Sequence, residues 1–229
     1  MKNRTKYFAY PYVVWIFLFI ALPSFLVLLY SITTKESNGL TTIHFTFENF
    51  KKFFNPMYLN ILWDSIYLAA VSTAICLVLG YPAAFIISNT HISRRSTLLF
   101  LCILPMWMNM LLRTYAWMTI LGNNGILNNF FSFLGLPKVN MLYTRGATVM
   151  GMVYNFLPFM ILPIYTALSK MDKGLLEAAD DLGANKKTVF RKVILPLSMP
   201  GVISGIIMVF MPAVSTFIIP QLLGGNKNM

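Results

Sequence analysis

Apolar stretches long enough to cross a membrane recur along the chain, and polar segments separate them. A helix needs about 20 apolar residues to cross a bilayer, and the first stretch meets this length without a single charge. The pattern predicts five membrane-spanning helices, at about residues 9–32, 60–88, 97–121, 147–169 and 197–223.

Two of the connecting segments are long and polar, and both are expected to be loops. Residues 33–59 carry most of the charges near the N-terminus, whereas residues 122–146 are rich in Gly and Asn, with a short helix predicted at 126–134. Prolines inside the spans, such as Pro23, predict bends because proline removes a backbone hydrogen bond.

The most charged stretch of the chain, residues 170–196, lies between two of the most apolar ones. Because bare charges are costly in hydrocarbon, this stretch must lie at a membrane surface. Asp172 is a candidate N-cap for a first short helix, and Gly183 supplies the left-handed residue that ends it. Asn185 can cap a second helix. The pattern therefore predicts a helix–glycine–helix element.

Both short helices are amphipathic, with one apolar face directed inward and one charged face directed outward. In the second helix four cations share one stripe and four apolar residues share the other. An element of this kind can simply anchor the neighbouring spans at the membrane surface, and physical chemistry alone leaves that alternative open. The cations are Lys186, Lys187, Arg191 and Lys192, and the apolar residues are Val189, Phe190, Val193 and Ile194.

The distribution of Lys and Arg predicts that the N-terminus and residues 170–196 are cytoplasmic, because cytoplasmic segments carry an excess of these residues. Six cations fall in the segments predicted to be outside, and Arg113 lies within a span. The remaining 11 of the 18 cations fall on the inner side. The outer cations are Lys35, Lys51, Lys52, Lys138, Arg145 and Lys227; the inner ones are Lys2, Arg4, Lys6, Arg94, Arg95, Lys170, Lys173, Lys186, Lys187, Arg191 and Lys192.

Composition supports an integral membrane protein over a soluble domain, since 57% of the 229 residues are hydrophobic and 11% are charged. The net charge of +11 would favour nucleic acid in a soluble protein. Here the placement of the charges favours a membrane instead, and no nucleic-acid partner is expected. Cys76 and Cys102 both fall in apolar stretches, so buried thiols are expected rather than a metal site or a disulfide. The sequence shows no zinc spacing, phosphate-binding loop or nucleophile motif.

Two charged residues lie inside predicted spans, Asp64 in the second and Arg113 in the third. A charge in a span usually faces a cavity or a partner, so both are candidates for a translocation path. Alternatively, Asp64 reaches out to the interface and Arg113 anchors a neighbouring helix. Aromatic residues such as Trp107 and Tyr115 can line such a path, since ring faces attract cations.

The charged stretch carries a family resemblance. Glu177-Ala178-Ala179, three residues, Gly183, nine residues, then Val193-Ile194-Leu195-Pro196 resembles the EAA loop of ABC-importer permeases. Val193 departs from the Ile that is usual in the family. In that family the loop forms a coupling helix that docks onto a cytoplasmic ATPase. The resemblance implies this ATPase-coupling role for Glu177, Ala178, Ala179, Asp180 and Gly183.

Further segments are similar to permeases of spermidine/putrescine importers: LVLGYPAAF (77–85), LPMWMNMLLRTYAW (104–117), LEAADDLGA (176–184) and PLSMPGVISG (196–205). The resemblance implies one all-α, polytopic helix bundle of the ABC type I importer class in the cytoplasmic membrane. It implies three partners: an ABC ATPase dimer, a second permease and an extracytoplasmic substrate-binding protein. ATP and Mg²⁺ would be bound by the ATPase, so this chain is expected to bind no cofactor and to be no enzyme.

Several functions remain open at this stage. The EAA loop also occurs in permeases for other solutes, such as ferric iron, phosphonates or amino acids. Such permeases usually have six spans, whereas five are predicted here, so the sixth is expected to be missing after residues 197–223. A truncated, non-transporting fragment is a further alternative. An ion-coupled carrier or a membrane enzyme is disfavoured, because neither histidine lies in a span.

Overall fold

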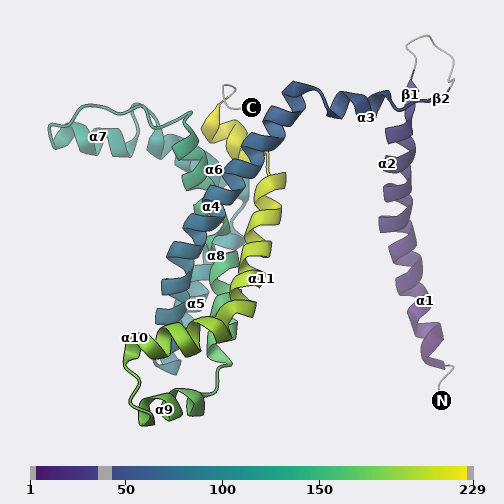
Figure 1. Ribbon diagram of the computed structural model, residues 1–229. Helices are drawn as coiled ribbons and strands as arrows, with labels where there is room; N and C mark the ends of the chain where they lie inside the picture. Colours follow the sequence, from purple (N-terminus) through teal and green to yellow (C-terminus); the bar gives the residue numbers. More distant parts are fainter. Residues whose placement is uncertain (1–3, 36–42, 226–229) are drawn as a thin grey trace. The chain divides into compact units, whose positions relative to one another are not determined.

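The computed structural model describes residues 4–35 and 43–225. The described chain is helical apart from one short β-ribbon, which confirms the all-α prediction. It divides into two compact units, Met1–Leu62 and Trp63–Met229, and each is described by itself. Figure 1 labels the elements along the chain.

The first unit contains the first predicted span. Helix α1 (Arg4–Ile16), the π-helical turn η1 (Phe17–Ala21) and helix α2 (Leu22–Ile32) follow one another without a break, and residues 10–32 are long and apolar enough to cross a membrane. Pro23 lies in the first turn of α2, directly after the π-helical turn. The wider turn provides the local adjustment with which helices accommodate proline.

The segment predicted as a plain polar loop, 33–59, is more structured than expected. Strands β1 (Thr33–Lys35) and β2 (Ile43–Phe45) pair antiparallel, and helix α3 (Glu48–Phe53) follows. The Asn49 side chain donates hydrogen bonds to the carbonyls of Ser31 and Thr33 at 3.2 and 3.3 Å. These bonds satisfy groups that the end of α2 leaves without helical partners. The next helix also begins earlier than predicted, at residue 56.

The second unit is built around α4 (Pro56–Asn89), α8 (Arg145–Ser169) and α11 (Leu195–Ser215), which supply most of the core. Met160 of α8 is fully buried between two glycines. A Cβ atom at Gly80 of α4 would lie 2.9 Å from Met160 Cγ, and one at Gly205 of α11 would lie 2.8 Å from its Sδ. The absence of a side chain at both glycines therefore lets the three helices approach closely, as small residues do in membrane bundles.

The third predicted span, 97–121, is wrong as a single helix. Helix α5 (Ile92–Ile103) continues into the 3₁₀ turn η2 (Leu104–Trp107), and α6 (Met110–Leu121) then leaves at an angle. The segments Ile92–Trp107 and Met110–Phe133 are bent by 92° relative to each other. Pro105 cannot donate a backbone hydrogen bond. In addition, Asn109 Oδ1 accepts from the backbone N–H of Leu111 at 2.8 Å, which caps a new helix start.

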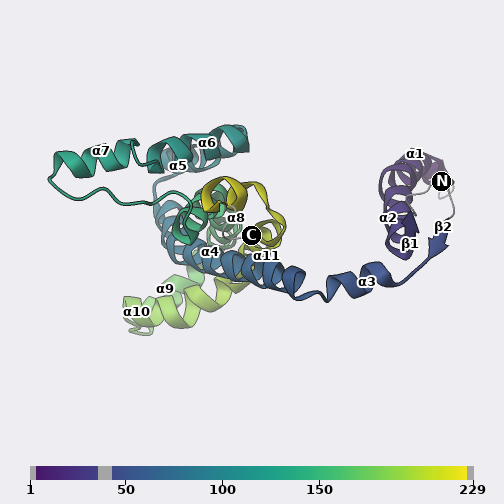
Figure 2. The same cartoon turned by 90° about the horizontal axis from the view of Figure 1, so that it is seen from above.

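The short helix predicted in the 122–146 loop is confirmed as α7 (Ile126–Phe133). Asn128 is buried there, and its amide bonds both ways with the Val139 backbone, donating at 3.0 Å and accepting at 2.9 Å. Figure 2 shows α7 reaching sideways, away from the group of α4, α8 and α11.

The fifth predicted span, 197–223, is corrected at both ends. One continuous helix runs over residues 186–215, made of α10 (Lys186–Val189), the π-helical turn η3 (Phe190–Ile194) and α11. Thr216 is extended, and the π-helical turn η4 (Pro220–Gly224) follows separately. Pro196 lies just after the π-helical turn η3, and the wider turn provides the local adjustment with which a continuous helix accommodates proline. Within the described residues four helices can span a membrane, or five if the bent pair counts as one.

Candidate coupling and translocation sites

Helix α9 (Lys173–Asp181) forms the first half of the predicted helix–glycine–helix element, and its ends are as predicted. At the start, Asp172 Oδ1 accepts a hydrogen bond from the Gly174 backbone at 2.9 Å. At the end, Gly183 has a φ of +74°, and the Ala184 N–H donates to the Ala179 carbonyl at 3.1 Å. This 6→1 hydrogen bond is typical of the Schellman motif, which needs a residue with left-handed backbone conformation at the position of Gly183.

The second half is anchored to the bundle through its apolar face. Asn185 caps it by accepting from the Thr188 backbone N–H at 2.8 Å. Val189 is buried, and the Phe190 ring meets Tyr81 and Phe85 of α4 edge-on, with centroids 5.9 and 5.7 Å apart. The opposite stripe is exposed, as predicted: Lys186, Lys187, Arg191 and Lys192.

The apolar side of α9 is less buried than predicted. Leu182 is 87% exposed and Leu175 is 48% exposed, whereas Leu176 is half-buried beside Phe85 and Ile194. The prediction that the whole apolar stripe faces inward is therefore wrong for Leu175 and Leu182. Figure 1 shows α9 standing off from the bundle, which agrees with the exposure of Leu175 and Leu182.

The predicted coupling residues lie together on this exposed helix and its exit turn. The side chains of Glu177 and Ala178 are exposed, and Ala179 is half-buried. A Cβ atom added at Gly183 would meet nothing within 4 Å. Asp180 lies in the helix, but its side chain is outside the described set. Small residues, an acidic residue and uncovered leucines in one place form a surface that a protein partner can pack against.

The two ends of the second unit hold different elements, and the predicted inner cations lie at one of them. Figure 1 shows α9 and α10 at one end and α7 at the other. The end with α9 and α10 also holds the start of α5, with Arg94 and Arg95. The predicted inner cations from this unit therefore gather at one end. Two cations used in the orientation prediction, Lys2 and Lys227, lie outside the described residues.

Asp64 is paired rather than free. Its Oδ1 accepts from Arg145 Nη2 at 3.1 Å, which joins α4 to the first residue of α8. The Asp64 side chain is 35% exposed and that of Arg145 is 57% exposed. The sequence predicts Arg145 to lie in the outer loop 122–146 and gives no signal of its proximity to Asp64.

Arg113 is buried in α6, with 9% of its surface exposed. Its Nε and Nη1 atoms have no hydrogen-bond partner within the described chain. The guanidinium carbon lies 5.8 Å from the centre of the Tyr154 ring on α8, and Trp117 meets the same ring edge-on at 5.5 Å. A ring face attracts a cation, so this contact supports the helix-anchoring alternative. A role of Arg113 in the path stays a prediction.

The two aromatic candidates are exposed. Trp107 is 76% exposed and touches Phe100 edge-on at 5.9 Å, and Tyr115 is 55% exposed. In the part of the chain that the structure describes, no hydrogen bond, ion pair or ring contact joins any two of Asp64, Arg113, Trp107 and Tyr115. The structure therefore does not bring these four residues together as the lining of one translocation path.

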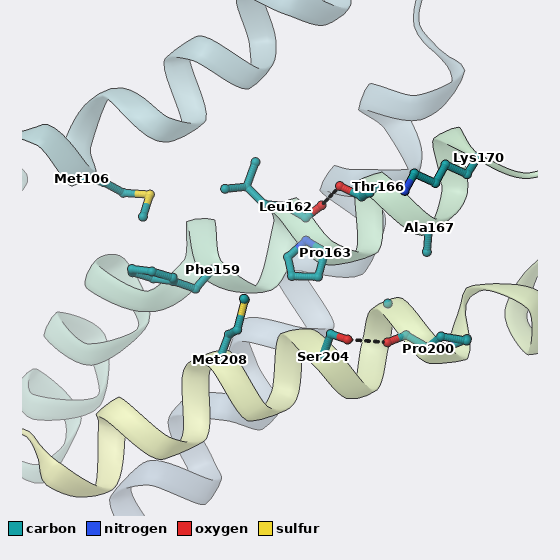
Figure 3. A pocket seen from close by; sticks show the side chains of 11 residues that line it. Met106, Phe159, Leu162, Pro163, Thr166, Ala167, Lys170, Pro200, Ser204 and Met208 are labelled. Atoms are coloured by element: carbon teal, nitrogen blue, oxygen red, sulfur yellow. Dashed lines mark hydrogen bonds between the residues drawn. The ribbon is translucent and has the colours of Figure 1, made fainter. Parts of the chain in front are cut away.

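A cavity of about 620 Å³ lies along α8 and α11, and the sequence had not indicated it. Figure 3 shows Met106, Phe159 and Met208 around its apolar part and Lys170 toward one end. The Thr166 and Ser204 hydroxyls both donate to carbonyls of their own helices at 2.8 Å. The walls therefore present few free polar groups. Across the described residues, no cluster of His, Cys, Asp or Glu could hold a metal ion.

The fold defines the class of the protein. It resembles a crystal structure of a bacterial ABC transporter that imports the acidic polysaccharide alginate, with a TM-score of 0.75 and 16% identity. The match covers 94% of this chain and 76% of that one. Together with the apolar helices, this likeness makes the chain a multi-pass membrane protein with an ABC-transporter fold.

Sequence comparison names the family. The model of the family "Binding-protein-dependent transport system inner membrane component" matches residues 77–229, and the chain belongs to this family. It is 44% identical to the spermidine/putrescine transport system permease protein PotB of Haemophilus influenzae, over 93% of this chain and 75% of that protein. PotB of Escherichia coli K12 is 39% identical, over 94% and 79%. The E. coli inner membrane ABC transporter permease protein YdcU is 33% identical, over 80% and 63%. The chain is thus a permease, a membrane component of a transport system.

Proposed function

We propose that this permease forms part of an ATP-driven importer of polyamines such as spermidine and putrescine. The observation that carries the proposal is the 44% identity to a spermidine/putrescine permease over 93% of the chain. An aliphatic polycation also suits a membrane protein whose spans contain a carboxylate, Asp64, and several exposed aromatic side chains.

In this proposal α9 docks onto a cytoplasmic ATPase, which binds ATP and Mg²⁺, while this chain binds neither. The exposed Glu177 and the uncovered Leu182 support the docking role. A second permease would complete the membrane part, and an extracytoplasmic protein would deliver the substrate. A related arrangement supports this last partner: a bacterial alginate ABC transporter of similar fold, with a TM-score of 0.71, was crystallised with its substrate-bound periplasmic protein.

The proposed substrate is tested by uptake. We expect cells that express the complete transporter to accumulate radiolabelled spermidine, and unlabelled putrescine to compete. A polyamine importer must recognise the spaced ammonium groups that both compounds share. Cells that lack this chain are the control. Uptake that neither polyamine affects would contradict the proposal.

The proposed orientation has the N-terminus and α9 in the cytoplasm, as cations gathered at the α9 end support. We expect a membrane-impermeant maleimide to label Leu182→Cys in inside-out vesicles prepared without the ATPase but not in intact cells. Phe133→Cys on α7, at the other end of the unit, should show the reverse, since both positions are highly exposed, at 87% and 85%. The unsubstituted chain measures background from Cys76 and Cys102. Labelling of Leu182→Cys from outside would overturn the orientation.

A further inference from the structure

The ion pair between Asp64 and Arg145 is unusual in this chain. Among the acidic residues that the structure describes, Asp64 is the only one that lies in a span helix. Among the described residues of the second unit, this is also the only ion pair. A carboxylate in a span helix is expected to serve a partner or a substrate.

Arg145 is a weakly held partner for that carboxylate. Its side chain is 57% exposed, and one hydrogen bond of 3.1 Å joins Nη2 to Oδ1. Exposed ion pairs contribute little stability. Arg145 is also the first residue of α8, whose capped N-terminus carries the positive end of the helix dipole. A cation is disfavoured there, whereas a carboxylate is favoured. The guanidinium can therefore leave Asp64 for water at small cost.

The surroundings of the pair suit an alkyl chain with a cationic end. Tyr67 follows Asp64 by three residues, on the same side of α4, and the residue is 51% exposed. Tyr67, Trp117, Tyr154 and Arg145 all line one cavity of about 730 Å³ between α4 and α8, whose other walls are aliphatic. Ring faces attract ammonium groups, and aliphatic walls accept methylene groups.

We infer that Asp64 is an ammonium-binding residue for the substrate and that a primary ammonium group of a polyamine replaces the Arg145 guanidinium there. This inference rests on the proposed function. The exchange conserves charge, because one cation leaves the carboxylate as another arrives. The methylene chain then lies along the Tyr67 side of the cavity, and the remaining ammonium groups stay in water.

The exchange also explains why Arg145, a cation that competes with the substrate, lies beside Asp64. A transport site must bind its substrate well enough to accept it and weakly enough to release it. Arg145 supplies the second requirement, because its return to Asp64 expels the ammonium group. Arg145 is thus a tuning residue, and removing it has the opposite effect on affinity from removing Asp64.

The test compares single and double variants of the complete transporter in proteoliposomes, with radiolabelled spermidine as the probe. We expect Asp64→Asn to raise KM at least about tenfold, the size of one lost charge-assisted hydrogen bond. Arg145→Gln should lower both KM and kcat several-fold, because binding tightens and release slows. The double variant should behave like Asp64→Asn. Glu48→Gln with Lys52→Gln, which removes the exposed ion pair of α3, is the matched control.

The outcomes separate the alternatives. Opposite shifts of KM in the two single variants support the exchange. Equal losses of activity in both variants, with lower thermal stability, would show that the ion pair only holds α4 and α8 together. This result would overturn the inference. Unchanged KM in both would overturn it too, while leaving polyamine transport intact. Absence of spermidine uptake by the unsubstituted transporter would instead refute the proposed function.

Discussion

We expect Glu177→Lys to leave the permease folded and inserted but to abolish ATP-driven transport. Glu177 is exposed on α9 and makes no ion pair within the described residues. Surface substitutions of this kind usually change stability by less than about 0.5 kcal/mol. At an interface, however, a reversed charge placed against a like charge costs several kcal/mol. Because about 1.4 kcal/mol is tenfold in affinity, docking of the ATPase should weaken by at least about tenfold.

The measurement is co-purification of the ATPase together with ATP hydrolysis stimulated by the loaded binding protein. Glu177→Gln keeps the side-chain shape and removes the charge, so its loss should be intermediate. Glu48→Lys reverses another exposed acidic residue, on α3, and should leave coupling intact. Unaltered co-purification and stimulated hydrolysis in Glu177→Lys would exclude α9 as the docking helix.

We expect Gly201→Leu to prevent the second unit from folding. Gly201 of α11 is buried against α8, where a Cβ atom would lie 2.6 Å from Ala167 Cβ and 2.7 Å from the Pro163 carbonyl oxygen. Backbone cannot move aside like a flexible side chain, so the two helices must separate. Overpacking by small groups costs about 1–3 kcal/mol, and a whole isobutyl group adds more. Gly201→Ala, a single methyl group, should lower Tm by roughly 5 °C.

The readout is the monodisperse fraction in detergent, measured by size exclusion after heating. Gly146→Ala is the matched control, because a Cβ atom there meets only Thr144 Oγ1, at 3.7 Å. Alanine is a better helix former than glycine by about 1 kcal/mol, so this variant should be as stable as the parent or slightly more so. Equal stability of Gly201→Leu and Gly146→Ala would show that α8 and α11 do not pack closely.

Features set by near neighbours in the chain were predictable. The ends of α9 depend on Asp172 and Gly183, whose hydrogen bonds reach only a few residues away. The start of α10 depends on Asn185 in the same way. The first span needs only a long uncharged run, whatever it packs against. Each of these signals is complete within a short window of sequence.

The bend at residues 108–109 escaped prediction for a physical reason. Hydropathy measures how apolar a stretch is, but not its direction, and residues on both sides of the bend are apolar. Local signals were present in Pro105 and in Asn109, a side chain suited to capping. A proline within a span usually only bends the helix, so the full turn of 92° was not evident.

The sequence by itself determined the class of the protein, the approximate spans and the caps of the candidate coupling helix. Only the tertiary structure decided which side chains meet across the bundle. Asp64 and Arg145 are 81 residues apart, and Met160 lies between glycines of two other helices. Such contacts depend on how each helix is rotated about its axis. That rotation is set by packing between helices, which no single stretch of sequence contains.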